Sequence, residues 1–403
     1  MLENHTTNTF SNGTGMGPSQ TVRHVKDNDI SVHILSKVNR RHVDLKKLNL
    51  AMKELINYGD TFSLLHMFGD KNKYGTDGTL HNIFDDNLLA ETHYRYRSKG
   101  AIAYHHISDT YIALFSTFIP CGVWEAVEII ESLLKNDSSI QPKVVHADTQ
   151  GQSSVVFGLS YLFNIQLMPR IRNFKELKFY KADRDDSYSN IENLFDNNVI
   201  NWELIETHWQ DLMQVAISIH KGKISSSTLL RKLTNNSKKN KLFKAFRELD
   251  NVIRTIFLLE YISDAELRDS ITETTNKVES FNAISDWCIF GSRYIVASND
   301  PKEMEKAIKY NSIIVNCIVI QNLIDISQII YISYSDEGIT FSYLEMTATY
   351  PEELNIHGWL ESVTKKKIMH FPKNLDFIYE ECEQNPDNIL NIFHHYFSAI
   401  RYL

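Results

Sequence analysis

Apolar residues follow two different spacings along the chain. Before about residue 172, short apolar runs bounded by polar turns predict strands, and stretches with helical spacing lie between them. The predicted strands cover 101–108, 113–120, 143–148 and 165–171, and the predicted helices cover 123–134 and 153–163. After about residue 185 the strand pattern ends, and helical spacing predicts helices over 202–219, 226–233, 241–262, 265–290 and 302–330. This order indicates a mixed α/β sheet joined to long helices.

The two ends of the chain carry weaker patterns. Residues 1–20 are rich in Asn, Thr, Gly and Ser and show no signal peptide, so we expect a flexible leader there. Residues 335–403 mix strand-like and helical signals, and no structure is assigned to them. The most apolar stretch, 313–331, is interrupted by Asn, Gln and Asp, which favours a buried helix over a membrane span.

Composition narrows the class of protein. The 403 residues are 43% apolar and 23% charged, which suits one large globular domain or a few ordinary ones. The formal net charge of −8 excludes a generally basic nucleic-acid binder. The four cysteines have no paired spacing, so we expect a reducing, cytoplasmic setting without a disulfide frame or zinc site.

Positive charge is nevertheless concentrated in two blocks. Residues 221–247 contain nine Lys or Arg and no acid, and residues 170–181 contain five against one Glu. In an acidic protein such blocks favour contact with phosphates, and the alternative is a solvated helix face. The predicted phosphate-binding residues are Arg170, Arg172, Lys175, Lys178, Lys221, Lys223, Arg231, Lys232, Lys238, Lys239 and Lys241.

Common catalytic motifs are absent from the sequence. It contains no phosphate-binding P-loop, no nucleophile elbow and no HExxH metal pair. His105 and His106 are adjacent strand residues whose side chains point to opposite faces, so they cannot chelate one ion and a structural role is favoured.

Three carboxylate residues are better candidates for a catalytic site than these histidines. Asp148 ends a short apolar strand, and Asp77 lies in a Thr-Asp-Gly run that also reads as a turn. Glu279 is on a predicted helix whose apolar ridge contains Val278, Phe281, Ser285 and Cys288, and it shares the opposite, solvated arc with Asn282, Ala283 and Asp286. Acids on two strands and a helix would suit a two-metal phosphoryl-transfer site. Spacing alone does not select these three from the fifty acids of the chain.

Several longer runs carry a family resemblance. They include His146-Ala-Asp148 with the following Thr-Gln-Gly-Gln-Ser, the Pro169-Arg-Ile-Arg-Asn173 run, and the stretch from Thr275 to Asn282. Together with Thr76-Asp-Gly78 and His106–Phe115, they resemble the catalytic region of Tn-three family transposases, the replicative DNA transposases, in the same order over residues 9–330.

The resemblance implies a fold and a site. The fold would be α/β, an RNase H-like mixed sheet with a large helical insertion between the second Asp and the Glu of a DDE triad. Asp77, Asp148 and Glu279 would be the catalytic and metal-binding triad, separated by 71 and 131 residues, with Mg²⁺ or alternatively Mn²⁺ as the cofactor. The expected parts are a leader and helical, basic segment over 1–70, the α/β core over 71–182, the insertion over 183–268, catalytic helices over 269–334 and a divergent tail over 335–403.

The implied function is metal-dependent 3′-end nicking and strand transfer of a transposon. Its partners would be terminal inverted repeats and target DNA, with a homo-oligomer on DNA, no membrane, and a bacterial cytoplasmic, nucleoid-associated location. Family members also carry an N-terminal part that recognises the inverted repeats, which this chain does not match. This leaves open a separately encoded catalytic portion, or a truncated remnant that binds DNA or a partner transposase without catalysis. An independent RNase H-type nuclease is a third reading.

Overall fold

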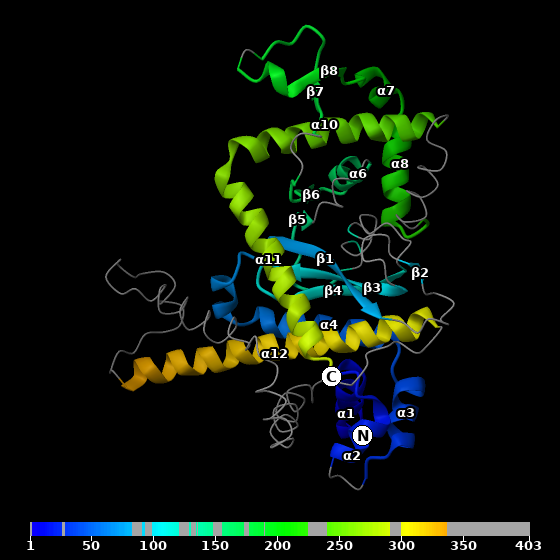
Figure 1. The fold of residues 1–403 in the computed structure, drawn as a ribbon, viewed down its shortest axis with the longest axis vertical. Helices are drawn as coiled ribbons and strands as arrows, with labels where there is room; N and C mark the ends of the chain where they lie inside the picture. The colour runs from blue at the N-terminus through cyan, green and yellow to red at the C-terminus, as the bar shows by residue number, and fades with distance from the viewer. Residues whose placement is uncertain are drawn as a thin grey trace. The chain divides into compact units, whose positions relative to one another are not determined.

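A computed structural model describes most of the chain up to residue 336. The described residues are 2–25, 29–82, 91–92, 99–120, 129, 134, 136–147, 155–172, 177–188, 190–224, 240–290 and 300–336. The chain divides into two compact units, drawn in Figure 1. The first comprises Met1–Phe68, Ile284–Tyr294 and Asp300–Leu403, and the second comprises Gly69–Ala283 and Ile295–Asn299.

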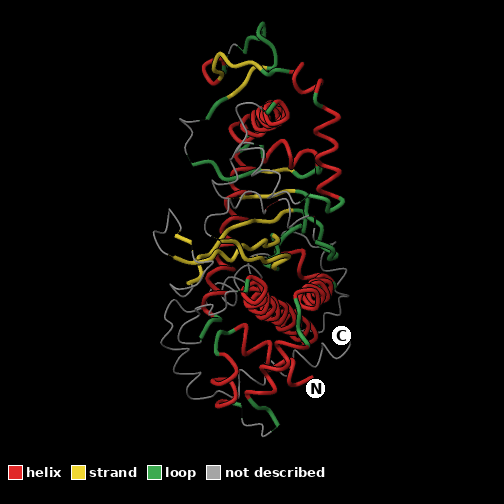
Figure 2. The backbone as a smooth tube through the Cα atoms, turned by 90° about the vertical axis from the view of Figure 1, so that its right-hand side faces the viewer, coloured by secondary structure: helices red, strands yellow, loops and turns green. Residues whose placement is uncertain are grey.

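A mixed sheet forms the core of the second unit. Its strands are β1 (Lys73–Asn82), β2 (Glu91–Thr92), β3 (Lys99–Ser108), β4 (Ala113–Pro120), β5 (Val144–Ala147) and β6 (Gln166–Leu167). The hydrogen-bonded order is β2-β3-β1-β5-β6, with β4 also paired to β3. β3 pairs antiparallel with β1, β2 and β4, whereas β5 pairs parallel with both β1 and β6. Figure 2 shows these strands side by side, and the mixed α/β prediction is confirmed.

In the sequence, one described helix of the second unit lies between β5 and β6, and the others follow β6. These helices are α6 (Val156–Leu162), α7 (Trp202–Thr207), α8 (Trp209–His220), α10 (Lys241–Ser263) and the part of α11 (Ala265–Trp287) up to Ala283. The long α10 contacts α6, α7 and α8. Helices predicted at 241–262 and 265–290 are therefore confirmed, whereas those at 123–134 and 226–233 lie largely or wholly outside the described residues.

Two sequence-based expectations about residues 185–220 are wrong. A short parallel pair, β7 (Phe179–Lys181) and β8 (Phe195–Val199), lies apart from the main sheet, so strands do not end at residue 185. β8 reads Phe-Asp-Asn-Asn-Val, which lacks apolar alternation, and it is held partly by the contact of Phe195 with Phe179. The helix expected over 202–219 is interrupted at His208, which leaves helical geometry and whose Nδ1 lies 2.9 Å from an Asp211 oxygen.

The first unit is helical in the described ranges. It contains α1 (Leu2–Gly13), α2 (Gly17–His24), α3 (Val32–Arg41), α4 (Leu45–Asp60), the 3-10 turn Ser63–Met67 and α12 (Pro301–Asp336). The flexible leader expected over residues 1–20 is thus wrong. α1 packs against α3 and α12 and buries Thr6, Thr7, Asn8 and Ser11.

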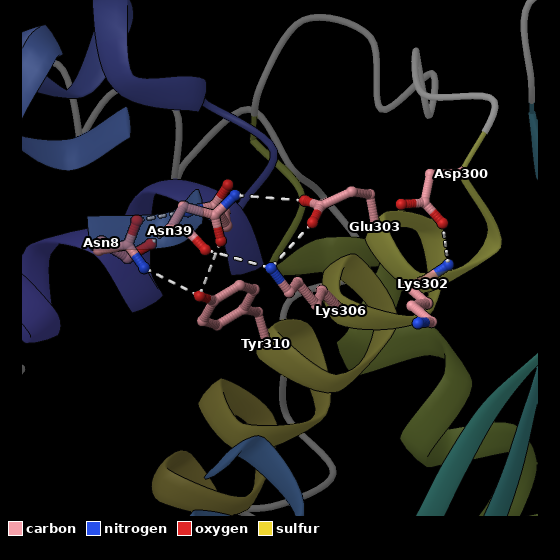
Figure 3. A network of polar contacts seen from close by, with 8 residues as sticks. Asn8, Asn39, Asp300, Lys302, Glu303, Lys306 and Tyr310 are labelled. Carbon is pink, nitrogen blue, oxygen red and sulfur yellow. Dashed lines mark hydrogen bonds and ion pairs between the residues drawn. The ribbon is translucent and has the colours of Figure 1, made fainter. Parts of the chain in front are cut away.

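Polar contacts explain why a hydrophilic segment is ordered here. The Asn8 amide donates to the Tyr310 hydroxyl (2.9 Å), and that hydroxyl donates to the side-chain oxygen of Asn39 (3.0 Å). Lys306 donates to the Asn39 carbonyl and pairs with Glu303 at 2.8 Å. The network, shown in Figure 3, joins α1, α3 and α12, segments far apart in the sequence. Because these polar groups satisfy one another, the polar composition of α1 does not prevent its burial.

The apolar helix α12 is the core helix of this unit. Over Pro301–Ser327 it is the one described helix long and apolar enough to cross a membrane, yet 67% of that window is buried within the protein. Ile313, Val315 and Ile320 are among its buried residues, in agreement with the predicted buried helix. Cys288 and Cys317, the cysteines among the described residues, are free and buried.

We expect Tyr310→Phe to lower the free energy of unfolding by about 1–3 kcal/mol, because the buried Asn8 amide and the half-buried Asn39 side chain lose their shared partner. Urea denaturation of the full chain measures this, with Tyr58→Phe, a change at an exposed tyrosine of the same unit, as the control. Equal stability of the two variants would show that α1 does not depend on this network.

Candidate active site

Asp77 lies in the middle of the sheet. It is the fifth residue of the ten-residue strand β1, where it is the Cα partner of His105 in β3. The turn reading of Thr76-Asp77-Gly78 is therefore wrong, because β1 continues through it to Asn82. Thr76, one residue earlier, is buried and accepts a hydrogen bond from the Tyr104 hydroxyl at 3.0 Å. Asp77 itself is half-buried, which leaves its carboxylate within reach of solvent or a ligand.

Helix α11 packs directly on β1 at Gly75. A Cβ atom at this glycine would lie 2.3 Å from a Val278 methyl carbon and 3.0 Å from the Thr274 carbonyl oxygen. One strand over, the Phe281 ring contacts His105 at 5.3 Å between centroids. The predicted ridge residues Val278, Phe281, Ser285 and Cys288 are all buried, so that prediction is confirmed. The absence of a side chain at Gly75 is what lets the helix approach the strand this closely.

Asn282 connects α11 to Asp77. Its side-chain nitrogen donates to one Asp77 carboxylate oxygen at 3.3 Å, and the residue is only 9% exposed. Helical spacing predicts Asn282 on the solvated arc with Glu279, and for Asn282 this prediction is wrong. Glu279 is exposed, as expected. Residues three apart lie on neighbouring positions of a helix, so Glu279 sits at the edge of the packed face, one turn before Asn282.

Asp148 falls outside the described residues. The strand that leads to it, β5, ends at Ala147, whose Cα partner in β1 is Thr76. On the other side, the backbone N–H of Arg170 donates to the Ala147 carbonyl at 2.8 Å. No group of three His, Cys, Asp or Glu side chains that could hold a metal ion occurs among the described residues, a search that does not include Asp148.

A buried turn beside the start of β1 anchors the same helix. Lys277 of α11 donates to the Asp109 carbonyl oxygen (2.9 Å), pairs with Glu273 (2.8 Å) and lies over the Tyr111 ring. The Asp109 carboxylate accepts backbone N–H groups of Asp70 and Lys71, just before β1. Burial, followed by a hydrogen bond with the Asp70 carboxyl, raises the pKa of Asp109 to about 7. No sequence pattern predicts this anchor, because its residues come from three separate segments.

Histidines near Asp77 are structural parts of the sheet. His105 and His106 are buried, His105 contacts Phe281 of α11, and His106 contacts Tyr74 and Phe115, which agrees with opposite-facing side chains. In β5, the His146 Nδ1 lies 3.2 Å from the Met168 carbonyl oxygen. Burial lowers the pKa of His146 to about 4, so its ring is neutral near pH 7.

A buried acid caps the helix that follows the Asp148 segment. Asp250 of α10 is 1% exposed and accepts the backbone N–H of Gly158 at 3.2 Å. Gly158 permits this approach, since a Cβ there would lie 3.1 Å from the Asp250 backbone nitrogen. Val155, immediately before α6, has a φ of +83°, which is strained for a β-branched residue. Burial raises the pKa of Asp250 to about 7, against the lowering effect of the Gly158 N–H.

The predicted phosphate-binding residues are only partly described. Arg172, Lys178, Lys221, Lys223 and Lys241 are exposed, and Arg170 is half-buried. Lys175, Arg231, Lys232, Lys238 and Lys239 lie outside the described residues. Lys181 of the same block is engaged with Glu192 and the Asp186 carbonyl. The five exposed side chains are therefore accessible to an anionic partner.

Comparison with known proteins identifies the family. The family model described as the Tn3 transposase DDE domain matches residues 2–345. The chain belongs to this family. Membership confirms the resemblance found in the sequence and implies a divalent metal cofactor.

Individual relatives are longer than this chain. The transposase for transposon Tn1546 of Enterococcus faecium is 26% identical over 330 residues, which are 81% of this chain and 32% of the relative. The transposase for transposon Tn3926 of Escherichia coli is 29% identical over 255 residues, 62% of this chain and 26% of the relative. The transposase for transposon gamma-delta of Escherichia coli (strain K12) is 25% identical over 292 residues, 72% and 29% of the two chains. The chain thus spans about a third or less of their length.

We expect Gly75→Ala to lower the free energy of unfolding by about 1–3 kcal/mol, because the new methyl group meets Val278 of α11. Adding Val278→Ala should recover part of this loss, so a double-mutant cycle in urea should show a coupling energy above about 0.5 kcal/mol. Strictly additive effects would mean that α11 does not rest on β1 at this point.

The Asp250 cap at α6 should make the free energy of unfolding depend on pH. The folded-state pKa of Asp250, about 7, lies above the ordinary value of 3.8, so its protonated form adds stability below about pH 4, and this is lost as the pH rises through 7. Asp250→Asn keeps an acceptor oxygen and does not titrate. We therefore expect the variant to lose less stability than the wild type between pH 5 and pH 8, by about 1–3 kcal/mol in urea denaturation. Parallel stability curves would contradict the assignment.

Proposed function

We propose that this chain is the catalytic portion of a DNA transposase, a polynucleotidyl transferase that nicks transposon ends and transfers them to target DNA. The observation that carries the proposal is the placement of Asp77 on a central strand directly under the helix that bears Glu279. Family membership supports the same reading. A carboxylate from a strand and one from a helix packed on that strand can converge on one bound ion without any long flexible connection.

Asp148 completes the proposed triad. Ala147 and Thr76 are Cα partners in a parallel pair, and the next residues of the two strands are Asp148 and Asp77. The proposed triad requires the carboxylates of these two aspartates to reach one ion. The sheet order, with β4, β3 and β1 antiparallel and β5 and β6 parallel, supports an RNase H-like core. Residues 183–268, between the α/β core and the helix that bears Glu279, would then form the insertion.

The residues present fit a divalent ion. Carboxylate oxygens are the ligands that Mg²⁺ and Mn²⁺ prefer, and Asp77 is half-buried with one oxygen held by Asn282. When bound, the ion would supply Lewis-acid activation of the reacting oxygens. Asp77, Asp148 and Glu279 would hold it, and the anchor between Lys277 and Asp109 would keep α11 from sliding along the sheet.

Two phosphoryl transfers make up the proposed reaction. In the first, a water oxygen attacks a phosphodiester phosphorus at the transposon end, and the bond from phosphorus to the 3′ oxygen breaks to leave a 3′ hydroxyl. In the second, that hydroxyl attacks a target phosphodiester and displaces a target 3′ oxygen. The exposed side chains of Arg172, Lys178, Lys221, Lys223 and Lys241 would contact DNA phosphates, with Arg170 beside the end of β5. The partners would be terminal inverted repeats and target DNA, with two or more copies assembled on DNA.

The remnant reading is less well supported. A chain without catalysis has no need of a half-buried aspartate with an ordered amide beside it, two residues from the glycine at which α11 packs on β1. An independent nuclease is likewise not favoured, because the named relatives are transposases.

Nicking of supercoiled plasmid DNA tests the proposal. We expect the full chain to convert the plasmid to nicked circles with Mg²⁺ or Mn²⁺ and not with EDTA. Asp77→Asn, Asp148→Asn and Glu279→Gln should each lower the rate by about 100-fold or more, since each removes a charge that holds the ion. DNA retention on a gel should be unchanged, because the basic side chains are intact.

Asp269→Asn is the matched control, an exposed acid on the same helix. It should nick at the wild-type rate. Failure of the wild type to nick, even when a fragment containing the rest of a related transposase is supplied, would favour the remnant. Wild-type activity in Asp148→Asn would instead remove Asp148 from the triad.

A further inference from the structure

Asn282 has a polar atom that its known contact does not use. The side-chain nitrogen donates to Asp77, whereas the side-chain oxygen is buried and accepts no hydrogen bond within the described part of the chain. The opposite orientation of the amide would place two oxygens against each other, so the observed orientation is the favourable one. The oxygen therefore faces away from the carboxylate that holds its nitrogen.

An unused buried carbonyl oxygen is costly. Leaving such an acceptor without a partner costs about 1–3 kcal/mol, so a purely structural position would be expected to carry an apolar or fully bonded side chain. Asn282 is 9% exposed, lies one helical turn from Glu279 and touches Asp77. Its free acceptor thus belongs to a side chain that contacts one proposed metal-binding acid and lies one helical turn from a second.

We propose that Asn282 is a positioning residue of the metal site, whose amide nitrogen orients Asp77 while its oxygen accepts a hydrogen bond from the hydration shell of the divalent ion. This inference rests on the proposed function. Residues in the shell behind metal ligands orient those ligands, and their loss commonly weakens metal binding by 10–100-fold. The neutral amide suits this place, because a further carboxylate would repel Asp77 whenever the ion is absent.

Metal binding by the full chain tests this without relying on activity. Mn²⁺ is the probe, its affinity is measured by calorimetric titration, and the unfolding temperature is measured with Mn²⁺ and with EDTA. Asn282→Ala should bind Mn²⁺ about 10-fold or more weakly than the wild type, with a smaller Mn²⁺-induced rise in unfolding temperature. Asn276→Ala, which alters an exposed asparagine of the same helix, should match the wild type in both measurements.

Asn282→Asp should have the opposite effect on the Mn²⁺-induced rise in unfolding temperature. Its carboxylate would face Asp77, so the variant should unfold at a lower temperature than the wild type in EDTA and gain more from Mn²⁺. This pattern differs from simple loss of packing, which lowers both temperatures equally.

The outcomes separate the two proposals. If the wild type and Asp77→Asn respond equally to Mn²⁺, the proposed metal site is wrong and the inference falls with it. If Asp77→Asn loses the response while Asn282→Ala keeps wild-type affinity, the site stands and Asn282 is only a structural partner of Asp77.

Discussion

The close approach of α11 to β1 is the constraint on which the candidate site depends. Gly75 has no side chain, so Val278 and the backbone of Thr274 rest directly on the strand, two residues before Asp77. That contact sets both the height and the rotation of the helix over the sheet. With the helix seated in this way, Asn282 reaches Asp77 and Glu279 lies at the accessible edge. A larger residue at position 75 would move every group that the helix carries.

Buried polar groups complete what apolar packing begins. Hydrophobic contact is non-directional, so it presses α11 onto β1 and α10 onto α6 without defining the position of either helix along its axis. The Lys277 contact with the Asp109 carbonyl and the Asp250 contact with the N-terminus of α6 are directional and define that position. Both acids have a pKa raised by burial, which shows that the protein accepts a desolvation cost at these two points. In the first unit, hydrogen bonds between amide and hydroxyl groups likewise join α1 and α3 to α12.

The sequence by itself determined the class of the fold and the identity of the candidate acids. Apolar spacing located β3, β4, α10 and α12 closely, because long periodic segments bury one face whatever their neighbours are. The family resemblance, rather than spacing, selected Asp77, Asp148 and Glu279, and comparison with known proteins confirmed the family. Roles for these three residues stay proposals, with Asp148 outside the described residues.

Tertiary structure decided what local pattern could not. The segment containing Asp77 reads as a turn by its Thr-Asp-Gly composition, and it is a strand because β3 and β5 pair with β1 on both sides. α1 reads as a flexible leader by its polar composition, and it is a buried helix because distant residues satisfy its amides and hydroxyls. Asn282 reads as solvated from its helical arc, and it is buried because Asp77 lies beneath it. In each case the deciding partner is distant in sequence, so the free energy that fixes the local structure comes from contacts that periodicity and composition do not encode.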